Sequence, residues 1–192
     1  MKLRIPFFLI ICALLFTQSK FAAAQSELVA NLNDGRHILL MRHADAPGYG
    51  DPKNYLISQC STQRNLGDLG KKQAKNTGEW LSSLGIQQAK VFSSPWCRCV
   101  DTATLLNKGV VKKDAALGSF FDDMGQAKKQ TDDLTKLIAS EQKRYPSTPI
   151  IMVTHHVNIE SYVGMVVNSG DMVLVKVDST GKPLSFKLYP SP

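Results

Sequence analysis

The chain lacks internal repeats and low-complexity segments, and it contains no long run of basic residues. Its 192 residues, 43% hydrophobic and 20% charged, suit one compact domain rather than two. A chain of this length can bury a substantial core, so neither a metal ion nor a disulfide is needed to explain folding.

The sequence also has no apolar run long enough to span a bilayer comfortably. Lys2 and Arg4 provide a basic start, residues 5–16 are apolar apart from one proline, and small residues lie at 22–24. This order is typical of a cleaved secretory signal. We therefore expect a signal peptide at 1–24 and a periplasmic or secreted mature protein; an uncleaved anchor is the alternative.

The remaining residues, 25–192, are expected to form the folded domain. The full chain has a net charge of +7, and loss of Lys2, Arg4 and Lys20 leaves 20 basic against 16 acidic residues, a net charge of +4. This mild excess favours a small anionic substrate or a generic surface over nucleic acid.

Cysteines are few, and those of the expected mature chain are Cys60, Cys97 and Cys99. Cys97 and Cys99 are too close together for a zinc knuckle, and no nearby histidine completes a metal set. In an oxidising compartment we expect Cys60 to form a disulfide with either Cys97 or Cys99.

What is present is an alternation of short apolar runs and helical patterns. Strands are predicted at 37–41, 89–93, 149–154, 172–177 and 184–188. Helices are predicted at 69–84, 94–106, 128–144 and 157–167, and residues 107–127 are expected to be irregular. This order predicts an α/β fold, a three-layer αβα sandwich with a mostly parallel central sheet.

Polar residues lie where three of the predicted buried strands end. Arg42 and His43 follow the first strand, Arg98 lies in the helix after the second, and His155 and His156 follow the third. Ligands in such folds bind beyond the carboxyl ends of the strands. Each group alone is an ordinary loop feature, but together they predict one positively charged pocket.

The residue types in that pocket suit a phosphoryl group. Arginine stays protonated and presents a planar fork to phosphate oxygens. With Ser94 as its cap and Pro95 at its first position, the next helix would add backbone N–H donors. A neutral imidazole can attack phosphorus without a separate base, while a carboxylic acid protonates the leaving oxygen. No metal or other cofactor is required.

Taken together, three motifs resemble the histidine phosphatase superfamily, which has the phosphoglycerate-mutase-like fold. Residues 40–44, Leu-Met-Arg-His-Ala, resemble its Arg-His-Gly signature, with Ala44 in place of glycine. Residues 93–103 are similar to the second signature, and residues 153–155 to the third.

The resemblance implies that His43 is the phospho-accepting nucleophile. It implies that the phosphoryl group is bound by Arg42, Arg98 and His155. Arg64 lies in a less uniform segment that often faces the pocket, and it is assigned to substrate binding.

The proton donor is expected in the irregular segment beyond the second signature. Asp122 and Asp123 both fall there, and we choose Asp123 over Asp122. His155 is followed by His156 where the acid-phosphatase and phytase branch has an acid, and this departure disfavours that branch.

These features predict a metal-independent phosphomonoester hydrolase that forms a phosphohistidine. The expected partners are a small phosphorylated substrate or an envelope glycan phosphate, with no nucleic acid and no stable membrane insertion after cleavage. The alternatives are a non-catalytic phosphate-binding module that retains the pocket and an envelope protein in which the fold has a structural role.

Overall fold

The computed structural model describes residues 27–192. The predicted signal peptide at 1–24 therefore lies outside the described residues. Within the described part of the chain, no helix is both long and apolar enough to cross a membrane.

The core of the fold is a six-stranded sheet with the strand order β3-β2-β4-β1-β5-β6. Four strands are mutually parallel: β1 (His37–Arg42), β2 (Lys90–Ser93), β3 (Val111–Lys113) and β4 (Ile150–Thr154). The last two, β5 (Met172–Val177) and β6 (Pro183–Tyr189), pair antiparallel. All five residues of β4 are buried, as expected for a strand covered on both faces.

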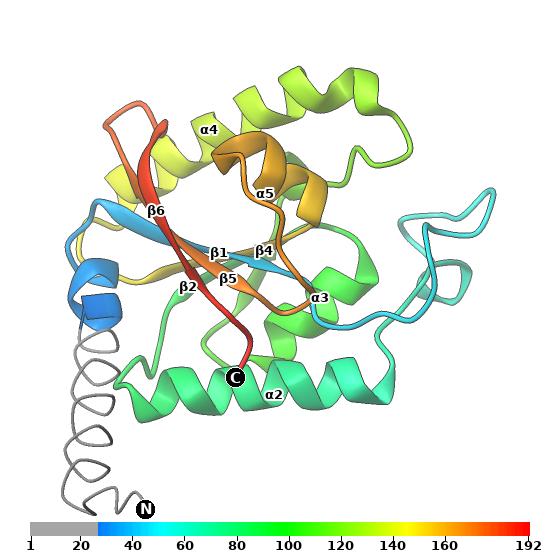
Figure 1. The fold of residues 1–192 in the computed structure, drawn as a ribbon, viewed down its shortest axis with the longest axis horizontal. Helices are drawn as coiled ribbons and strands as arrows, with labels where there is room; N and C mark the ends of the chain where they lie inside the picture. The colour runs from blue at the N-terminus through cyan, green and yellow to red at the C-terminus, as the bar shows by residue number, and fades with distance from the viewer. Residues whose placement is uncertain (1–26) are drawn as a thin grey trace, which may run out of the picture.

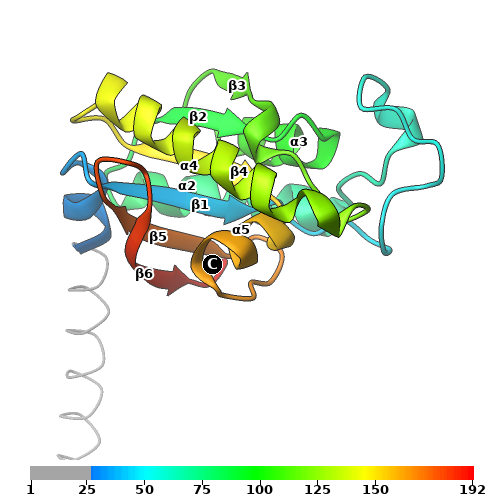
Figure 2. The same cartoon turned by 90° about the horizontal axis from the view of Figure 1, so that it is seen from above.

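Helices cover both faces of this sheet. Figures 1 and 2 show α4 (Ala127–Arg144) and α5 (His156–Val163) on one side, and α2 (Asp68–Ser83) and α3 (Cys97–Leu105) on the other. Each interface has its own apolar cluster, one including Leu81 from α2 and the other Ile138 from α4. The predicted three-layer αβα sandwich with a mostly parallel sheet is confirmed.

Three local predictions were wrong. The predicted start of α3 at Ser94 is incorrect, because the helix begins at Cys97 and has no side-chain cap. The segment predicted to be irregular contains the short edge strand β3, which pairs in parallel with β2. Helix α5 ends at Val163, because Gly164 adopts a left-handed conformation with φ 73°.

A long connection, residues 43–67, leads from β1 to α2 and lies beyond the carboxyl ends of the strands (cyan in Figures 1 and 2). It contains a single turn of 3-10 helix, Cys60–Thr62. Cys60 forms a disulfide with Cys97, which settles the predicted pairing, and Cys99 is a free, buried thiol. The Gln63 side chain also accepts a hydrogen bond from the Cys97 N–H at 3.0 Å. This connection is therefore attached to the start of α3 by a covalent bond and a hydrogen bond.

Candidate active site

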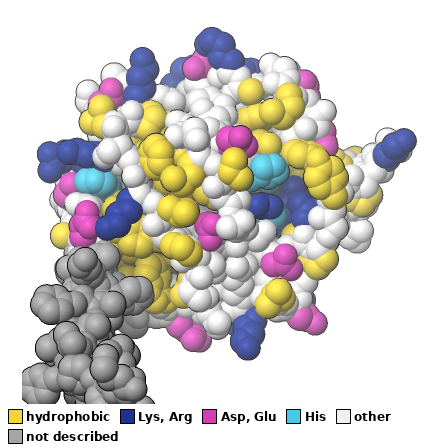
Figure 3. Space-filling view, in the orientation of Figure 1, with side chains coloured by type: hydrophobic (Ala, Val, Ile, Leu, Met, Phe, Trp, Pro, Cys, Tyr) yellow, Lys and Arg dark blue, Asp and Glu magenta, His cyan; other side chains and the backbone are white. Residues whose placement is uncertain are grey.

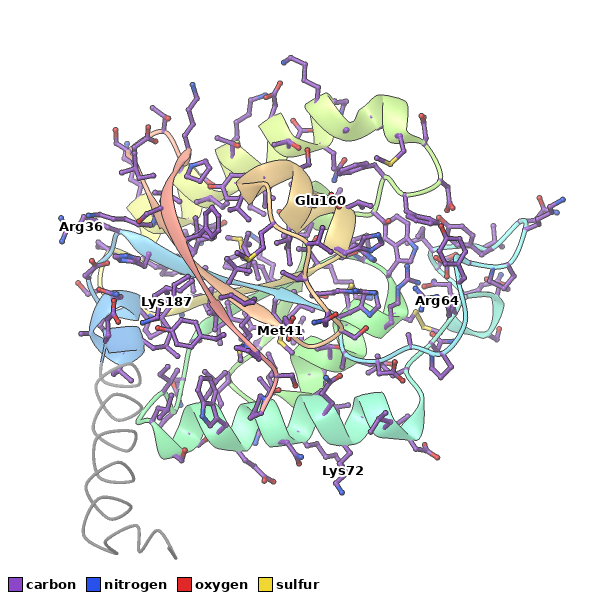
Figure 4. The ribbon with its side chains drawn as sticks, viewed as in Figure 1. Arg36, Met41, Arg64, Lys72, Glu160 and Lys187 are labelled. Carbon is purple, nitrogen blue, oxygen red and sulfur yellow. A yellow bond between two sulfur atoms is a disulfide. The ribbon has the colours of Figure 1, made fainter. Side chains whose placement is uncertain are left out.

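A pocket of about 350 Å³ opens at the carboxyl ends of β1, β2 and β4. Figure 4 places Met41 near this end of β1, with Arg64 beyond it, and Arg36 at the opposite end of the sheet. In Figure 3, dark blue and cyan side chains lie together in a hollow on this side of the molecule, beside yellow side chains. The pocket is lined by five of the six predicted site residues: Arg42, His43, Arg64, Arg98 and His155.

His43 is the buried imidazole of the pocket, with 2% of its surface exposed. Its Nδ1 lies 2.8 Å from the carbonyl oxygen of Ala44, which can only accept, so the ring proton is assigned to Nδ1. The lone pair is then on Nε2, where Arg98 Nε donates a hydrogen bond at 3.3 Å. Burial, reinforced by Arg98 and Arg42, lowers the pKa of His43 to about 3. His43 is therefore a neutral base with Nε2 as its nucleophilic atom.

Arg42 is the last residue of β1 and contributes a donor that the protein does not use. Its Nη1 donates to the Val167 carbonyl at 2.8 Å, which fixes the side chain. Its Nε is buried and has no hydrogen-bond partner among residues 27–192. A buried donor without a partner is costly, and an anion in the pocket would satisfy it.

Arg98 is held by Asp51, a residue that the motif analysis missed. Arg98 Nη1 lies 2.9 Å and 3.0 Å from the two carboxylate oxygens of Asp51, and both side chains are 4% exposed. The carboxylate also accepts from the Arg64 backbone N–H at 2.9 Å and from Trp96 Nε1 at 3.1 Å. Asp51 thus both balances the charge of Arg98 and orients its Nε toward His43. It is a positioning residue, and its place in an irregular loop gives no sequence signal.

His155 lies against His43, with the two ring centroids 5.5 Å apart. Its Nε2 is 2.8 Å from the hydroxyl of Ser94, the residue predicted to cap α3. Because that hydroxyl accepts the Trp96 N–H at 3.4 Å, its own proton is free to point at Nε2, and the imidazole proton is assigned to Nδ1. Burial, reinforced by the charge of Arg98, lowers the pKa of His155 well below its usual value. His155 is therefore a neutral hydrogen-bond donor.

Arg64 lines the pocket, but its guanidinium is committed to the loop after β1. Its Nε donates to the Gly50 carbonyl at 2.9 Å, and its Nη1 donates to the carbonyls of Ala46 and Gly48. The predicted substrate-binding residue therefore also shapes the loop that forms one wall of the pocket.

The sixth predicted residue, Asp123, does not line the pocket, and its neighbour Asp122 does. Asp123 caps a 3-10 helix, Met124–Gln126, by accepting from the Gly125 N–H at 3.1 Å. Asp122 accepts a hydrogen bond from the Tyr55 hydroxyl at 3.3 Å. The turn geometry therefore places Asp122, and not Asp123, at the pocket.

The described residues contain no group of three or more His, Cys, Asp or Glu side chains positioned to hold a metal ion. What converges instead is a set of three arginines, Arg42, Arg64 and Arg98, around two neutral imidazoles, with Asp45, Asp51 and Asp122 also in the lining. This combination is suited to bind a tetrahedral oxyanion and to attack its central atom.

Comparison with known proteins agrees with this geometry. A sequence model of the histidine phosphatase superfamily (branch 1) matches residues 38–133, a range that includes His43 and Arg98 but not His155. The mitochondrial serine/threonine-protein phosphatase Pgam5 of Drosophila ananassae is 37% identical over 75 residues, which is 39% of this chain and 23% of the relative. Pgam5 of Drosophila yakuba is 33% identical over 81 residues, which is 42% of this chain and 25% of the relative. The matched part thus spans about a quarter of the length of these relatives.

Solved structures show the same fold. A phosphoserine phosphatase from Entamoeba histolytica superposes with a TM-score of 0.59 at 14% identity, covering 78% of this chain and 95% of that one. A mycobacterial glucosyl-3-phosphoglycerate phosphatase gives 0.52 at 17% identity, covering 80% and 96%. The protein histidine phosphatase SixA gives 0.51 at 15% identity, covering 80% and 94%. At these identities the likeness establishes the fold alone.

His43 should remain neutral far below the usual pH of histidine titration. An unfolded histidine takes up a proton near pH 6.5, whereas folded His43 does so only at about pH 3. The stability that this difference confers is complete above about pH 6.5 and is lost as the pH falls toward 3. Imidazole ¹⁵N NMR, assigned with His43→Gln, should show a protonated Nδ1 and a bare Nε2 at pH 5. A titration midpoint between pH 6 and 7 would contradict this assignment.

Asp51→Asn should destabilise the fold, because it leaves the buried guanidinium of Arg98 without a counter-charge. Breaking a buried ion pair from one side costs about 3–5 kcal/mol. Denaturant unfolding would measure the loss. Asp133→Asn is the matched control, because it breaks exposed contacts with Lys129 and Lys136 and should change stability little. If both substitutions lowered the free energy of unfolding by the same amount, the buried Arg98–Asp51 pair would contribute no more to stability than an exposed pair.

Proposed function

The chain belongs to the histidine phosphatase superfamily, and on that premise we propose that it is a phosphomonoester hydrolase that forms a phosphohistidine at His43. The observation that carries the proposal is the state of His43. Its imidazole is neutral, its proton is on Nδ1, and its Nε2 faces the guanidinium of Arg98. A neutral imidazole held among arginines is both nucleophilic and placed where a phosphoryl group would bind.

In the first step, His43 Nε2 attacks phosphorus and the bond from phosphorus to the ester oxygen breaks. Arg42 Nε, Arg98 and the Nδ1–H of His155 donate to the non-bridging oxygens, whose negative charge they offset. Asp122, in its protonated form, gives its proton to the departing oxygen, so the leaving group departs as a neutral alcohol.

In the second step, water attacks the phosphorus of phosphohistidine. Asp122, now a carboxylate, accepts one proton from that water as the bond between phosphorus and Nε2 breaks. The products are inorganic phosphate, the original neutral His43 and a reprotonated Asp122. Every group that transfers a proton or binds the phosphoryl oxygens is a side chain of this chain, so the reaction is proposed to be metal-independent.

We further propose an extracytoplasmic substrate, either a small phosphomonoester or an envelope glycan phosphate. The leader-like residues 1–24 support export, and the Cys60–Cys97 disulfide is a bond that persists in oxidising compartments. The mild net charge expected for the mature chain supports a small anionic substrate rather than nucleic acid.

A second candidate is a non-catalytic phosphate-binding module. It is favoured by the hydrogen bond from Arg98 Nε to His43 Nε2, which occupies the lone pair that must attack. The two candidates predict the same binding of inorganic phosphate but differ in whether a phosphoenzyme forms.

His43→Ala should abolish hydrolysis of an aryl phosphate such as 4-nitrophenyl phosphate. Removing a covalent nucleophile is expected to lower kcat by more than about a thousandfold. Acid-labile ³²P labelling of the wild-type protein should be lost in the variant. His37→Ala, which removes a histidine of the same strand outside the pocket, is the control and should retain activity. Unchanged turnover by His43→Ala would rule out the mechanism, whereas phosphate binding without labelling in the wild type would favour the binding module.

Asp122→Asn and Asp123→Asn should separate the two candidate acids. Loss of a general acid lowers kcat by about 10²–10⁴-fold where the leaving group is a basic alkoxide. We expect this loss for alkyl phosphates with Asp122→Asn, and a much smaller one for 4-nitrophenyl phosphate, whose leaving group needs no proton. Asp123→Asn should stay within a few-fold of wild type with both substrates. The reverse ranking would restore Asp123 as the proton donor.

A further inference from the structure

Three aromatic rings line the same pocket as His43 but have no part in the phosphoryl chemistry. Tyr49 and Phe121 pack edge to face with ring centroids 5.2 Å apart and an interplanar angle of 79°. Phe121 in turn lies 5.6 Å from the ring of His156. Tyr49 is 88% exposed, so its ring is open to solvent. We call Tyr49, Phe121 and His156 the aromatic rim.

The rim is held in place by the surrounding loop. Gly48 and Gly50, on either side of Tyr49, have φ of 95° and 66°, in the region that favours glycine. The carbonyls of both glycines accept hydrogen bonds from the Arg64 side chain. The turn that presents Tyr49 is therefore fixed by Arg64.

Phe121 is held from the other side of the pocket. Its neighbour Phe120 is buried, so successive side chains point in different directions and leave Phe121 at the pocket. The Phe121 N–H donates to the Ser119 hydroxyl at 3.2 Å, which fixes the local turn. The two rings thus come from separate parts of the chain and meet only at this pocket.

The direction of the proposed reaction gives the rim a role. Attack by His43 Nε2 and departure of the ester oxygen are in line, so the leaving group points away from the buried histidine. His43 and Tyr49 line one pocket, and because His43 is 2% exposed and Tyr49 is 88% exposed, Tyr49 belongs to the solvent side of that pocket. The proposed proton donor, Asp122, is adjacent in sequence to Phe121 and lines the same pocket.

We propose that the aromatic rim is a leaving-group subsite that selects phosphomonoesters with a planar aromatic group, of the aryl or arylmethyl class. The inference rests on the proposed function. Exposed ring faces and edges stack well on a flat aromatic group.

The test compares two ligands that differ in aromaticity and have similar size. Benzylphosphonate and cyclohexylmethylphosphonate cannot be hydrolysed, so calorimetry measures their binding without any reaction. Wild-type protein should bind the benzyl compound about three- to tenfold more tightly. Tyr49→Leu and Phe121→Leu should each reduce that ratio toward one. Phe186→Leu, which changes an exposed phenylalanine on β6 that does not line the pocket, should leave the ratio unchanged.

Turnover of benzyl phosphate and cyclohexylmethyl phosphate provides the second measurement, because their leaving groups are similarly basic. The ratio of kcat/KM should follow the binding ratio in every variant.

Equal binding of the two phosphonates by the wild type would overturn the inference, as would an aromatic preference that survives in Tyr49→Leu. A binding preference without turnover of either ester would instead overturn the proposed function and leave the rim as an aromatic subsite. Tighter binding of phosphocholine than of benzylphosphonate, lost in Tyr49→Leu, would identify a cation site and overturn the aromatic assignment.

Discussion

The buried ion pair between Arg98 and Asp51 is the interaction on which the rest of the pocket depends. Without Asp51, a guanidinium that is 4% exposed would have no counter-charge, a state that desolvation strongly disfavours. With it, the same contact orients Arg98 toward His43 and holds the loop after β1 against the start of α3 through Trp96 and the Arg64 backbone. Charge balance and geometry at the nucleophile are therefore supplied by one carboxylate.

With Asp51 supplying the counter-charge of Arg98, the two histidines can be buried beside the arginines without a charge of their own. An imidazole can lose its charge near neutral pH at little cost, so His43 and His155 can be placed in a dry, positive environment as neutral rings. Each then keeps one nitrogen as a donor and one as an acceptor, and a backbone carbonyl or a serine hydroxyl decides which. Burial thus keeps both rings neutral, and the hydrogen-bond partners of each ring fix its tautomer.

The site residues that come directly after buried strands were predictable from sequence, because the apolar pattern locates the ends of those strands. Arg42, His43 and His155 come directly after buried strands, and parallel strands bring their ends together whatever the loops do. Asp51 was not predictable, because its position depends on the path of a loop that no local pattern specifies. Asp122 and Asp123 differ only in which side of one turn they face. Ser94 was predicted to cap a helix, and its hydrogen bond to His155 could not be foreseen because the two residues are 61 positions apart in the sequence. Long-range pairing decided the cases of Asp51 and Ser94, and a local turn decided that of the two aspartates.

The Cys60–Cys97 disulfide constrains one end of the loop that borders the pocket. It joins the loop to α3 beside Arg98, and the Gln63 side chain reinforces that junction. The wall formed there cannot swing away as a hinged lid would. The 47–50 turn is held to the rest of the loop by the Arg64 hydrogen bonds rather than by a covalent bond. The pocket is therefore bordered on one side by a covalent cross-link and at the turn that carries Tyr49 by hydrogen bonds alone.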